Sequence, residues 1–383
     1  MRYLILTITL ALSISIFTGC ASKKVDTQTT QKISKKIKLE KIDFDDIDGF
    51  EQDNLQKAFT VFKKDCKAKQ IDPNLKDVCK EASNYKDGRV FFTKNFIPYQ
   101  IIDQKGDDEG LITGYYEPTL KGNYYKTKKY KYPIYKLPND LVKIDLADAY
   151  PSLANKTLRG KLIKNKVVSY GSRQEIDSID YRTSKSLKPI CFVDDKIDLF
   201  FLHIQGSGKI LLPNGKYIYV GYAGQNGYPY YSIGKEFIKR GLIKKEDISL
   251  ETIKQWLKTH PQQADEIMNL NRSYIFFQVR SQGATGSLGT LLIPNRNIAI
   301  DKTIVPLGYP VFIQTTNPIT QQPINKLVVA ADTGGAIKGD IRADIFFGSG
   351  KIAQKLAGMM KNDGKLIIFV PKNNSKEKDA LNK

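Results

Sequence analysis

The sequence predicts a mainly β protein, built around a barrel with flanking helices, and three observations lead to this prediction. Between Cys191 and Gly234, short runs of β-branched and aromatic residues are broken by Gly, Pro and Asn. This punctuation is typical of barrels made of short strands. Helical spacing is confined to a few segments. The chain of 383 residues exceeds what one small core usually serves, so we expect two domains.

The N-terminus has the organisation of a secretory signal. Arg2 precedes an unbroken apolar run that ends in small residues and Cys20, and this run is too short for a spanning helix. The ending FTGCAS resembles the lipobox of bacterial lipoproteins, so residues 1–19 would be removed and Cys20 would carry the lipid. The absence of Asp after Cys20 favours the outer membrane of a Gram-negative cell. The alternative is that Cys20 only ends an ordinary signal.

A polar, Lys-, Thr- and Gln-rich segment follows, and we expect residues 20–50 to form a lipidated flexible tether. Helical spacing of apolar residues then begins at Leu55, and a second helical segment runs through Cys79. Cys66 and Cys79 flank a Pro-containing loop between these segments, and an oxidising periplasm permits a disulfide there. Cys191 is expected to be a buried, small apolar residue.

The rest of the chain is expected to alternate between strands and a few helices. Residues 88–102 and 110–120 are rich in aromatic and β-branched residues, which favours strands, and PNGK at 213–216 is a hairpin signal. Ser232 and Ser249 are good N-caps for two helices. Strands are then expected in five segments: 273–279, 289–294, 298–314, 326–332 and 365–371.

Composition excludes several functions. The net charge of +20 would suit a polyanion, but the lysines are scattered and the signal argues against nucleic acid, so adhesion to anionic envelope polymers is preferred. There are two histidines and no metal-binding motif, so a transition-metal site is not expected. His203 lies in an apolar run and is interpreted as a core or hydrogen-bonded strand residue. His260 precedes Pro261 and looks like a helix end, which disfavours Ser-His-Asp hydrolysis.

One carboxylate-rich stretch remains as the candidate site. VVAADTGGAIKGDIRADIFFGSG, residues 328–350, carries Asp332, Asp340 and Asp344. A metal site, an acid/base centre and a solvated loop are the three interpretations. Together with many aromatic residues and Gln/Ser loops, these acids suit carbohydrate, because glycosidic cleavage needs a carboxyl group that protonates the leaving oxygen.

Several motifs resemble one known family. DTGGAIKGDIRADIFFG with IAIDKTIVPLG resembles the three-aspartate domain of the membrane-bound lytic transglycosylase A family, the acids being Asp301, Asp332 and Asp344. TGYYEP, SYGSRQEID, FFLHIQGSG and GYAGQNGYPYYSIG resemble the family-specific insert. The resemblance runs from about residue 85 to 372 and implies a six-stranded double-psi β-barrel with a second, β-rich domain inserted into it and flanking helices.

The resemblance also implies domain boundaries and a reaction. The barrel would comprise residues 51–116 and 274–372, the insert residues 117–273, and a polar tail residues 373–383. The substrate would be peptidoglycan glycan strands, bound in a groove between the two domains. The bond between N-acetylmuramic acid and N-acetylglucosamine would be cleaved without water, leaving a 1,6-anhydro ring, and neither metal nor cofactor would take part.

In that family one aspartate acts alone, and it corresponds to Asp344 here. Asp344 must be protonated near neutral pH, and an apolar setting from Phe346 and Phe347 together with a nearby Asp332 could raise its pKa. Arg342 would oppose this effect, so we expect it to face elsewhere.

Further residues carry more limited expectations. Thr113 and Tyr115 resemble residues that line the cleft, whereas Tyr116 and Glu117 could equally be structural at the domain junction. Gln205 and Ser207 resemble sugar-contacting residues, although a tight turn at Gly206 and Gly208 explains the motif equally well. Asp301 is expected to brace a turn rather than to contact substrate, and Asp340 to be a solvated loop charge.

Two other functions compete with this one. A hydrolysing glycosidase would use Asp332 and Asp344 as a carboxylate pair. A non-catalytic peptidoglycan-binding lipoprotein would use the same barrel without cutting. Besides peptidoglycan and an outer membrane reached through the lipid, partners such as cell-wall synthases or division proteins are not identified by the sequence.

Overall fold

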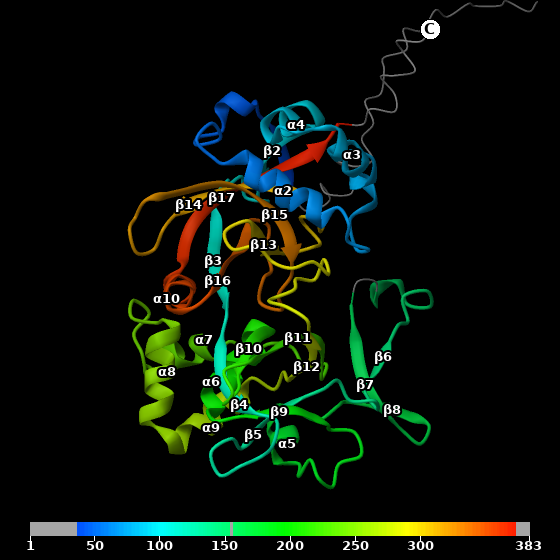
Figure 1. Cartoon of the computed structure of the whole chain (residues 1–383), viewed down its shortest axis with the longest axis vertical. Helices are drawn as coiled ribbons and strands as arrows, with labels where there is room; N and C mark the ends of the chain where they lie inside the picture. Colours follow the sequence, from blue (N-terminus) through cyan, green and yellow to red (C-terminus); the bar gives the residue numbers. More distant parts are fainter. Residues whose placement is uncertain (1–36, 154–155, 373–383) are drawn as a thin grey trace, which may run out of the picture.

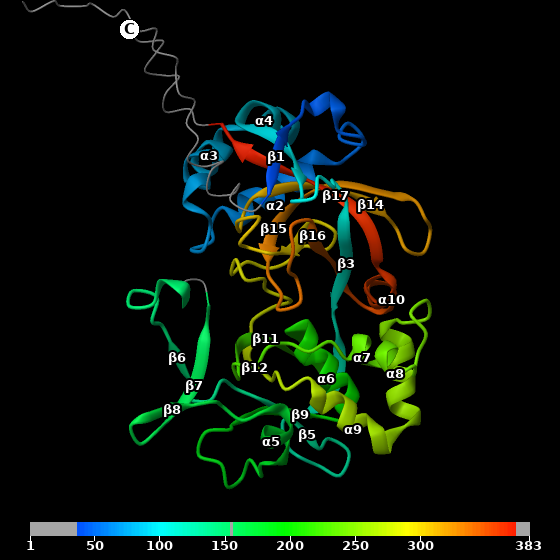
Figure 2. The ribbon, with the colours of Figure 1, turned by 180° about the vertical axis from the view of Figure 1, so that it is seen from behind.

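The computed structural model of the protein describes residues 37–153 and 156–372. Its strands form three sheets, of eight, six and three strands, so the mainly β prediction is confirmed. The eight-stranded and six-stranded sheets lie toward opposite ends of the molecule, and the three-stranded sheet stands to one side (Figures 1 and 2). No helix in the described ranges combines the length and the apolar character needed to cross a bilayer.

The eight-stranded sheet contains segments from both ends of the described chain. Its six central strands pair in the order β17, β14, β15, β13, β16 and β3, and β3 pairs back to β17, so the pairings form a closed ring. The members of this ring are β3 (Gly110–Glu117), β13 (Asn297–Ile300), β14 (Pro310–Thr316), β15 (Pro323–Asp332), β16 (Arg342–Ser349) and β17 (Lys361–Pro371).

The N-terminal end of the described chain extends this sheet. β1 (Lys38–Lys41) pairs antiparallel with β2 (Phe96–Ile102), which pairs with β17. Phe50 is 1% exposed and belongs to the main core. The prediction of a flexible tether over residues 20–50 is therefore wrong from residue 37 onward, because apolar side chains spaced among the charges anchor this part. Cys20, the signal over residues 1–19 and the tail over residues 373–383 lie outside the described residues.

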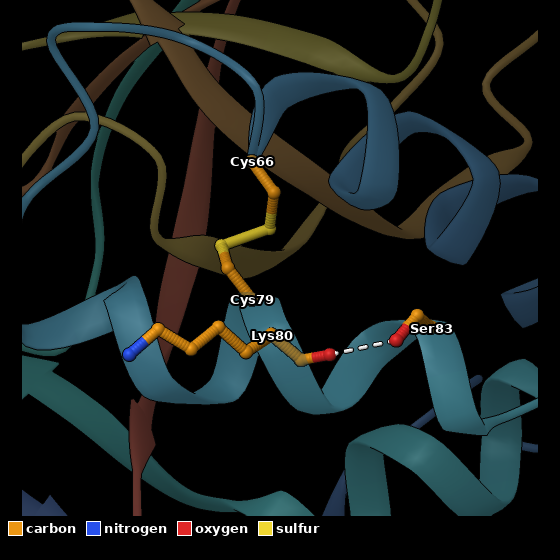
Figure 3. Close-up of a disulfide and its surroundings, with 4 residues drawn as sticks. All are labelled: Cys66, Cys79, Lys80 and Ser83. Carbon is orange, nitrogen blue, oxygen red and sulfur yellow. Dashed lines mark hydrogen bonds between the residues drawn. A yellow bond between two sulfur atoms is a disulfide. The ribbon is translucent and has the colours of Figure 1, made fainter.

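Helices and a disulfide cover the ring at this end (Figure 1). α2 (Leu55–Asp65) starts at Asn54, whose side chain accepts a hydrogen bond from the Lys57 backbone, and α3 (Lys76–Glu81) follows. Cys66 at the end of α2 is bonded to Cys79 in α3 with an S–S distance of 2.03 Å, which confirms the predicted disulfide (Figure 3). The carbonyl of Lys80 accepts a hydrogen bond from the Ser83 hydroxyl in the next turn.

The segment 88–102, expected to be extended throughout, is half helical. α4 (Gly88–Asn95) starts at Asp87, whose carboxylate accepts a hydrogen bond from the Val90 backbone at 2.9 Å. Its two adjacent phenylalanines, Phe91 and Phe92, are fully buried. The aromatic content that favoured a strand therefore reflects burial, and the capping Asp marks the helix start.

The six-stranded sheet is formed between β3 and β13 in the sequence. Its order is β12 (Ile275–Arg280), β11 (Tyr217–Gln225), β10 (Ser207–Leu211), β4 (Thr119–Asn123), β9 (Pro189–Val193) and β5 (Tyr132–Tyr135). The predicted hairpin at PNGK joins β10 to β11, with Gly215 at a φ of 79° that favours glycine. β12 lies in the segment 274–372 that the sequence assigned to the barrel, but it pairs with β11.

The run LFFLHIQ is a helix rather than a strand. α6 (Lys196–Gln205) starts at Asp195 and ends at Gly206, which has a φ of 76°. Leu199 and Leu202 pack into one hydrophobic cluster, and Phe200 and Phe201 into another. A helix that is buried on two sides has no polar stripe, so its sequence resembles a short buried strand. His203 is a core residue as expected, but a helical one.

The predicted helical region after β11 is confirmed. α7 (Ile233–Lys239) and α8 (Leu250–Thr259) are capped by the Ser232 and Ser249 hydroxyls, and α9 (Pro261–Leu270) follows His260. α10 (Lys351–Met359) follows β16 and approaches α8, where a Cβ on Gly358 would lie 3.3 Å from Leu250.

The remaining elements are short. The three-stranded sheet contains β6 (Val142–Ile144), β7 (Leu158–Ile163) and β8 (Lys166–Val168), and α5 (Arg173–Ser178) follows it. The strand expected over residues 289–294 is wrong, because that segment forms only an isolated bridge between Thr285 and Leu291. Leu292 belongs to a small cluster beside the ring, and Ile293 packs against the main core instead.

Candidate functional site

The register of the ring places two acids in one row. Asp344 on β16 lies opposite Thr113 of β3 on one side and Ala299 of β13 on the other. Ala299 lies in turn opposite Asp332, the last residue of β15. Because neighbouring strands are about 4.8 Å apart, the backbones of Asp332 and Asp344 are separated by about 10 Å. The fold thus brings two predicted site residues, 12 positions apart in the sequence, onto strands that share one neighbour.

The carboxyl group of Asp344 is held by one short hydrogen bond. Its Oδ1 accepts a hydrogen bond from the Thr113 hydroxyl at 2.7 Å. Burial raises the pKa of Asp344 to about 6, while the Thr113 hydrogen bond and the charge of Arg342 act downward and the charge of Asp332 acts upward. The side chain is half-buried and keeps some access to solvent. A carboxyl group with this pKa can both give and take a proton near neutral pH.

Arg342 lies beside this carboxyl group, so the prediction that it faces elsewhere is wrong. Its Nη2 donates a hydrogen bond to the Thr113 hydroxyl oxygen at 2.8 Å. The reason is the period of two along a strand, which places Arg342 and Asp344 on the same face of β16. Thr113 therefore accepts from the guanidinium and donates to the carboxylate, and its hydroxyl proton is oriented toward Asp344.

Asp332 is held much more tightly than Asp344. Its Oδ1 accepts hydrogen bonds from the Ser287 backbone and hydroxyl at 2.9 Å each, and from the Thr333 backbone at 2.8 Å. Its Oδ2 accepts from the Tyr115 hydroxyl at 3.0 Å. Burial raises the pKa of Asp332, although these hydrogen bonds oppose the increase. With about four acceptor positions on a carboxylate, Asp332 has little capacity left for a further partner.

The apolar surroundings of the site come from one of the two phenylalanines only. Phe346 is buried in the same cluster as Tyr115, with ring centroids 5.2 Å apart. Phe347 belongs to the main core, and its ring fills the space beside Gly114. The expected contribution of Phe347 to the setting of Asp344 is therefore wrong, because the two residues point to opposite faces of β16.

Asp301 braces a turn, as expected. It directly follows β13, and its Oδ1 accepts hydrogen bonds from the Thr303 backbone at 3.0 Å and hydroxyl at 2.9 Å. Lys338 lies 3.4 Å from the same oxygen. Burial acts upward on the pKa of Asp301, but the Thr303 hydrogen bonds and the Lys338 charge lower it overall. This third acid therefore remains ionised and structural.

Ligands for a metal ion do not gather here. Within residues 37–153 and 156–372, His, Cys, Asp and Glu side chains nowhere form a group of three or more that could hold a metal. The chemistry that this arrangement offers is proton transfer by one carboxyl group, with a second carboxyl group fixed in the scaffold.

Comparisons with known proteins assign the chain to a family. Two family models match, the MltA specific insert domain over residues 111–278 and the 3D domain over residues 296–370. A crystal structure of MltA from Neisseria gonorrhoeae is 31% identical and superposes with a TM-score of 0.75, covering 88% of this chain and 93% of that chain. The chain belongs to the membrane-bound lytic murein transglycosylase A family.

Further relatives support this family assignment. A membrane-bound lytic murein transglycosylase A homolog of Buchnera aphidicola is 34% identical over 275 residues, and the membrane-bound lytic murein transglycosylase A of Escherichia coli is 31% identical over 267 residues. The matches cover 69% and 67% of this chain, and 66% and 65% of those two proteins, just under two thirds of each. A membrane-bound lytic murein transglycosylase from Agrobacterium tumefaciens, 29% identical, superposes with a TM-score of 0.79, covering 88% of this chain and 99% of that one.

Gln205 and Ser207, from the part that matches the insert model, do not join the row of acids. The Gln205 side-chain oxygen accepts a hydrogen bond from the Tyr116 backbone at 3.1 Å, which ties the end of α6 to β3. Ser207 starts β10 and is 7% exposed. Between them Gly206 takes a left-handed conformation with a φ of 76°. These contacts correspond to the tight-turn interpretation of QGSG.

Glu117 connects the two larger sheets. It ends β3, and its carboxylate lies 3.0 Å from Lys209 of β10, while Lys209 also donates to the Ser349 hydroxyl at the end of β16 at 2.9 Å. Glu117 is 4% exposed, and burial raises its pKa against the opposing effect of Lys209. These contacts correspond to the structural alternative for Glu117 at the junction.

Sequence reasoning missed Ser287 and Tyr230. Ser287 lies in a loop between β12 and β13 and gives Asp332 two of its hydrogen bonds. Tyr230 from the loop before α7 lies against Gly335, because a Cβ on that glycine would be 3.6 Å from the Tyr230 Cβ. Neither residue stands near the acid-rich motif in the sequence, so only the fold could bring them to it.

Proposed function

We propose that this protein is a lytic transglycosylase, which cleaves the β-1,4 bond between N-acetylmuramic acid and N-acetylglucosamine in peptidoglycan and leaves a 1,6-anhydromuramyl end. The observation that carries this proposal is the environment of Asp344. Its carboxyl group is desolvated, has a pKa of about 6 and receives one hydrogen bond, from Thr113. Family membership and the names of the relatives support the same reaction.

The proposed reaction uses one carboxyl group twice. Protonated Asp344 donates its proton to the glycosidic oxygen as the bond between that oxygen and the muramyl C1 breaks, which releases N-acetylglucosamine as the leaving alcohol. The muramyl 6-hydroxyl oxygen then bonds to C1, and its proton passes to the Asp344 carboxylate. The enzyme regains its starting protonation state, and no water is consumed. A pKa near the working pH favours both halves of this cycle.

Asp332 supports this mechanism over hydrolysis by a carboxylate pair. A hydrolase needs a second carboxylate that is free to attack the sugar or to activate water. Asp332 already accepts four hydrogen bonds, from Ser287, Thr333 and Tyr115. We assign Asp332 a positioning role, in which it holds Tyr115 and the Ser287 loop around Asp344.

The finer points of fold and location are proposals as well. We infer that the closed ring of six strands is a double-psi β-barrel and that the six-stranded sheet belongs to a domain inserted into it, with glycan bound between the two. We further propose that Cys20 is lipidated and holds the protein on the outer membrane of a Gram-negative cell, facing the periplasm. The relatives that are named membrane-bound support an envelope location.

The test compares wild-type protein with Asp344→Asn on purified sacculi, and analyses the soluble products by mass spectrometry. The wild type should release anhydro-muropeptides, and Asp344→Asn should release none while keeping its circular dichroism spectrum. Asp340→Asn, a substitution in the same segment, serves as the matched control and should remain active. Release of muropeptides by Asp344→Asn would contradict the assignment. Binding of sacculi without any release by the wild type would favour the non-catalytic alternative.

A further inference from the structure

A cavity of about 300 Å³ lies away from Asp344. Its walls come from β5, α5, α6 and α9, from the loop that precedes β5 and from the segment that follows α5. No strand of the closed ring contributes to the residues that line it. α5 and β5 lie at the end of the molecule opposite to the covering helices α2 and α4 (Figure 1). The mechanism proposed for Asp344 makes no use of this cavity.

The deep wall of the cavity contains a fixed, buried arginine and a buried histidine. Arg173 is 3% exposed and donates to the carbonyls of Asn271 and Ser273 at 3.0 Å and 2.6 Å. Its third contact is with Nδ1 of His203 at 2.8 Å. Phe200 lies under the guanidinium at 4.8 Å. The guanidinium is therefore held in place without a carboxylate within ion-pair distance among the described residues.

The contact with Arg173 defines the tautomer of His203. A guanidinium can only donate, so Nδ1 of His203 must accept, and the ring proton of the neutral imidazole then lies on Nε2. Burial and the charge of Arg173 lower the pKa of His203 well below its ordinary value, so the ring is neutral. His203 is 4% exposed, and its Nε2 has no hydrogen-bond partner in the described part of the chain. A buried donor without a hydrogen-bond partner destabilises the folded protein unless a ligand or water supplies an acceptor.

The outer part of the cavity is positively charged. Of the residues that line it, Arg182 is paired with Asp180 at 2.6 Å and Lys196 with Asp265 at 2.8 Å. Lys126 and Lys131 remain, and neither lies within ion-pair distance of a carboxylate among residues 37–153 and 156–372. Their ammonium groups lie 5.7 Å and 5.9 Å from the Tyr181 and Tyr132 ring centroids. Asp177 is the one acid here without a direct ion pair.

We propose that this cavity binds a carboxylate-bearing peptide, with Lys126 and Lys131 attracting the carboxylates, the tyrosine rings contacting the aliphatic part and His203 donating from the wall. The volume is at the lower end of ligand cavities, so it accommodates part of a peptide rather than a polymer. We take the peptide to be the acidic stem peptide that peptidoglycan carries on its muramyl residues. This choice of source rests on the proposed function. A stem peptide held there anchors the protein to one strand while Asp344 acts on a sugar bond.

The test measures binding of the sugar-free tripeptide L-Ala-γ-D-Glu-meso-diaminopimelate to the purified protein by calorimetry. Lys126→Glu combined with Lys131→Glu should weaken binding by about tenfold or more, because two attractive charges become repulsive. The matched control, Lys128→Glu combined with Lys166→Glu, changes the net charge equally at exposed positions outside the cavity and should bind like the wild type. Asp177→Asn should tighten binding, because it removes a like charge from the mouth.

Other outcomes would overturn the proposal. Equal binding of the same tripeptide with its carboxylates amidated would exclude recognition of carboxylates. Displacement of the tripeptide by equimolar inorganic phosphate would identify a general anion site. The Lys126→Glu, Lys131→Glu variant should still cleave peptide-free glycan strands, and Asp344→Asn should still bind the tripeptide. The protein could therefore bind the tripeptide even if it did not cleave glycan, and it could cleave glycan even if it did not bind the tripeptide, so the two proposals can fail separately.

Discussion

Asp344→Asn should make the protein more stable at neutral pH although it removes the proposed catalytic group. Burial raises the pKa of Asp344 from 3.8 to about 6. Each pKa unit corresponds to about 1.4 kcal/mol, so keeping this carboxylate ionised in the folded protein costs about 3 kcal/mol. Asparagine resembles the protonated acid in shape and charge, and can still accept the hydrogen bond from Thr113. The substitution therefore removes the cost and keeps the contact.

The sign of the effect depends on pH in a defined way. Because the pKa of Asp344 is higher in the folded state than in the unfolded state, the folded protein binds more protons between the two values. The carboxyl group therefore lowers the free energy of unfolding progressively as pH rises from about 4 to about 6, and the full penalty is present above pH 6. At pH 3 both states are largely protonated, so wild type and Asp344→Asn should have similar stability there, and at pH 4 the difference is still only about 0.5 kcal/mol.

The assay is urea unfolding of both proteins at pH 4 and pH 8. The difference in unfolding free energy should be about 0.5 kcal/mol at pH 4 and reach about 3 kcal/mol in favour of Asp344→Asn at pH 8. Asp301→Asn provides a control of opposite sign, because the pKa of Asp301 is lowered in the fold and its ionised form stabilises the protein at pH 8. Equal stability of wild type and Asp344→Asn at pH 8 would refute the claim that Asp344 is a desolvated acid.

Three further predictions concern the surroundings of the site and the N-terminal helices. Arg342→Met removes a charge that lowers the pKa of Asp344, so the alkaline limb of the pH–rate profile should move upward by on the order of one unit; an unchanged limb would contradict this coupling. Replacing Cys66 and Cys79 together by serine should lower the unfolding free energy by about 3 kcal/mol, since the bridge closes a short loop, and reductant should have no further effect on that variant. Tyr115→Phe removes the hydroxyl that donates to Asp332, so the free energy of unfolding, measured by thermal unfolding, should fall by about 1–3 kcal/mol. An unchanged free energy would mean that this hydrogen bond does not stabilise the fold.

The sequence pointed to Asp344 as the proposed acid but not to the side chains that surround it. The acid-rich motif singled out Asp344 and Asp332, yet nothing in it showed that Asp332 is saturated by Ser287 and Tyr115 from distant segments. The position of Arg342 could have been inferred, because residues two apart on a strand share a face. The need for a protonated Asp344 alone favours a guanidinium that faces elsewhere, but the alternation of side chains along β16 places Arg342 on the same face as Asp344.

Helix starts and a turn were predicted correctly where capping and turn residues mark them in the sequence. Ser232, Ser249 and Gly215 mark helix starts and a turn that the structure contains. The segments of α4 and α6 were wrongly expected to be strands because their adjacent aromatic residues favour strands, and in α6 burial on two sides also removes the polar stripe that distinguishes a helix. The caps at Asp87 and Asp195 were the signals that could have corrected both assignments. The pairing of β3 with β16 joins segments more than 200 residues apart, which no local pattern encodes.

In the proposed reaction one carboxyl group cleaves the glycan, and the muramyl 6-hydroxyl, not water, attacks the sugar. Digestion of purified sacculi in water enriched in oxygen-18, followed by mass spectrometry of the released muropeptides, tests it most directly. The released muropeptides should carry 1,6-anhydromuramyl ends that contain no oxygen-18. Reducing muramyl ends that carry the heavy oxygen would contradict the transglycosylase reaction, because they would show that water attacks the sugar.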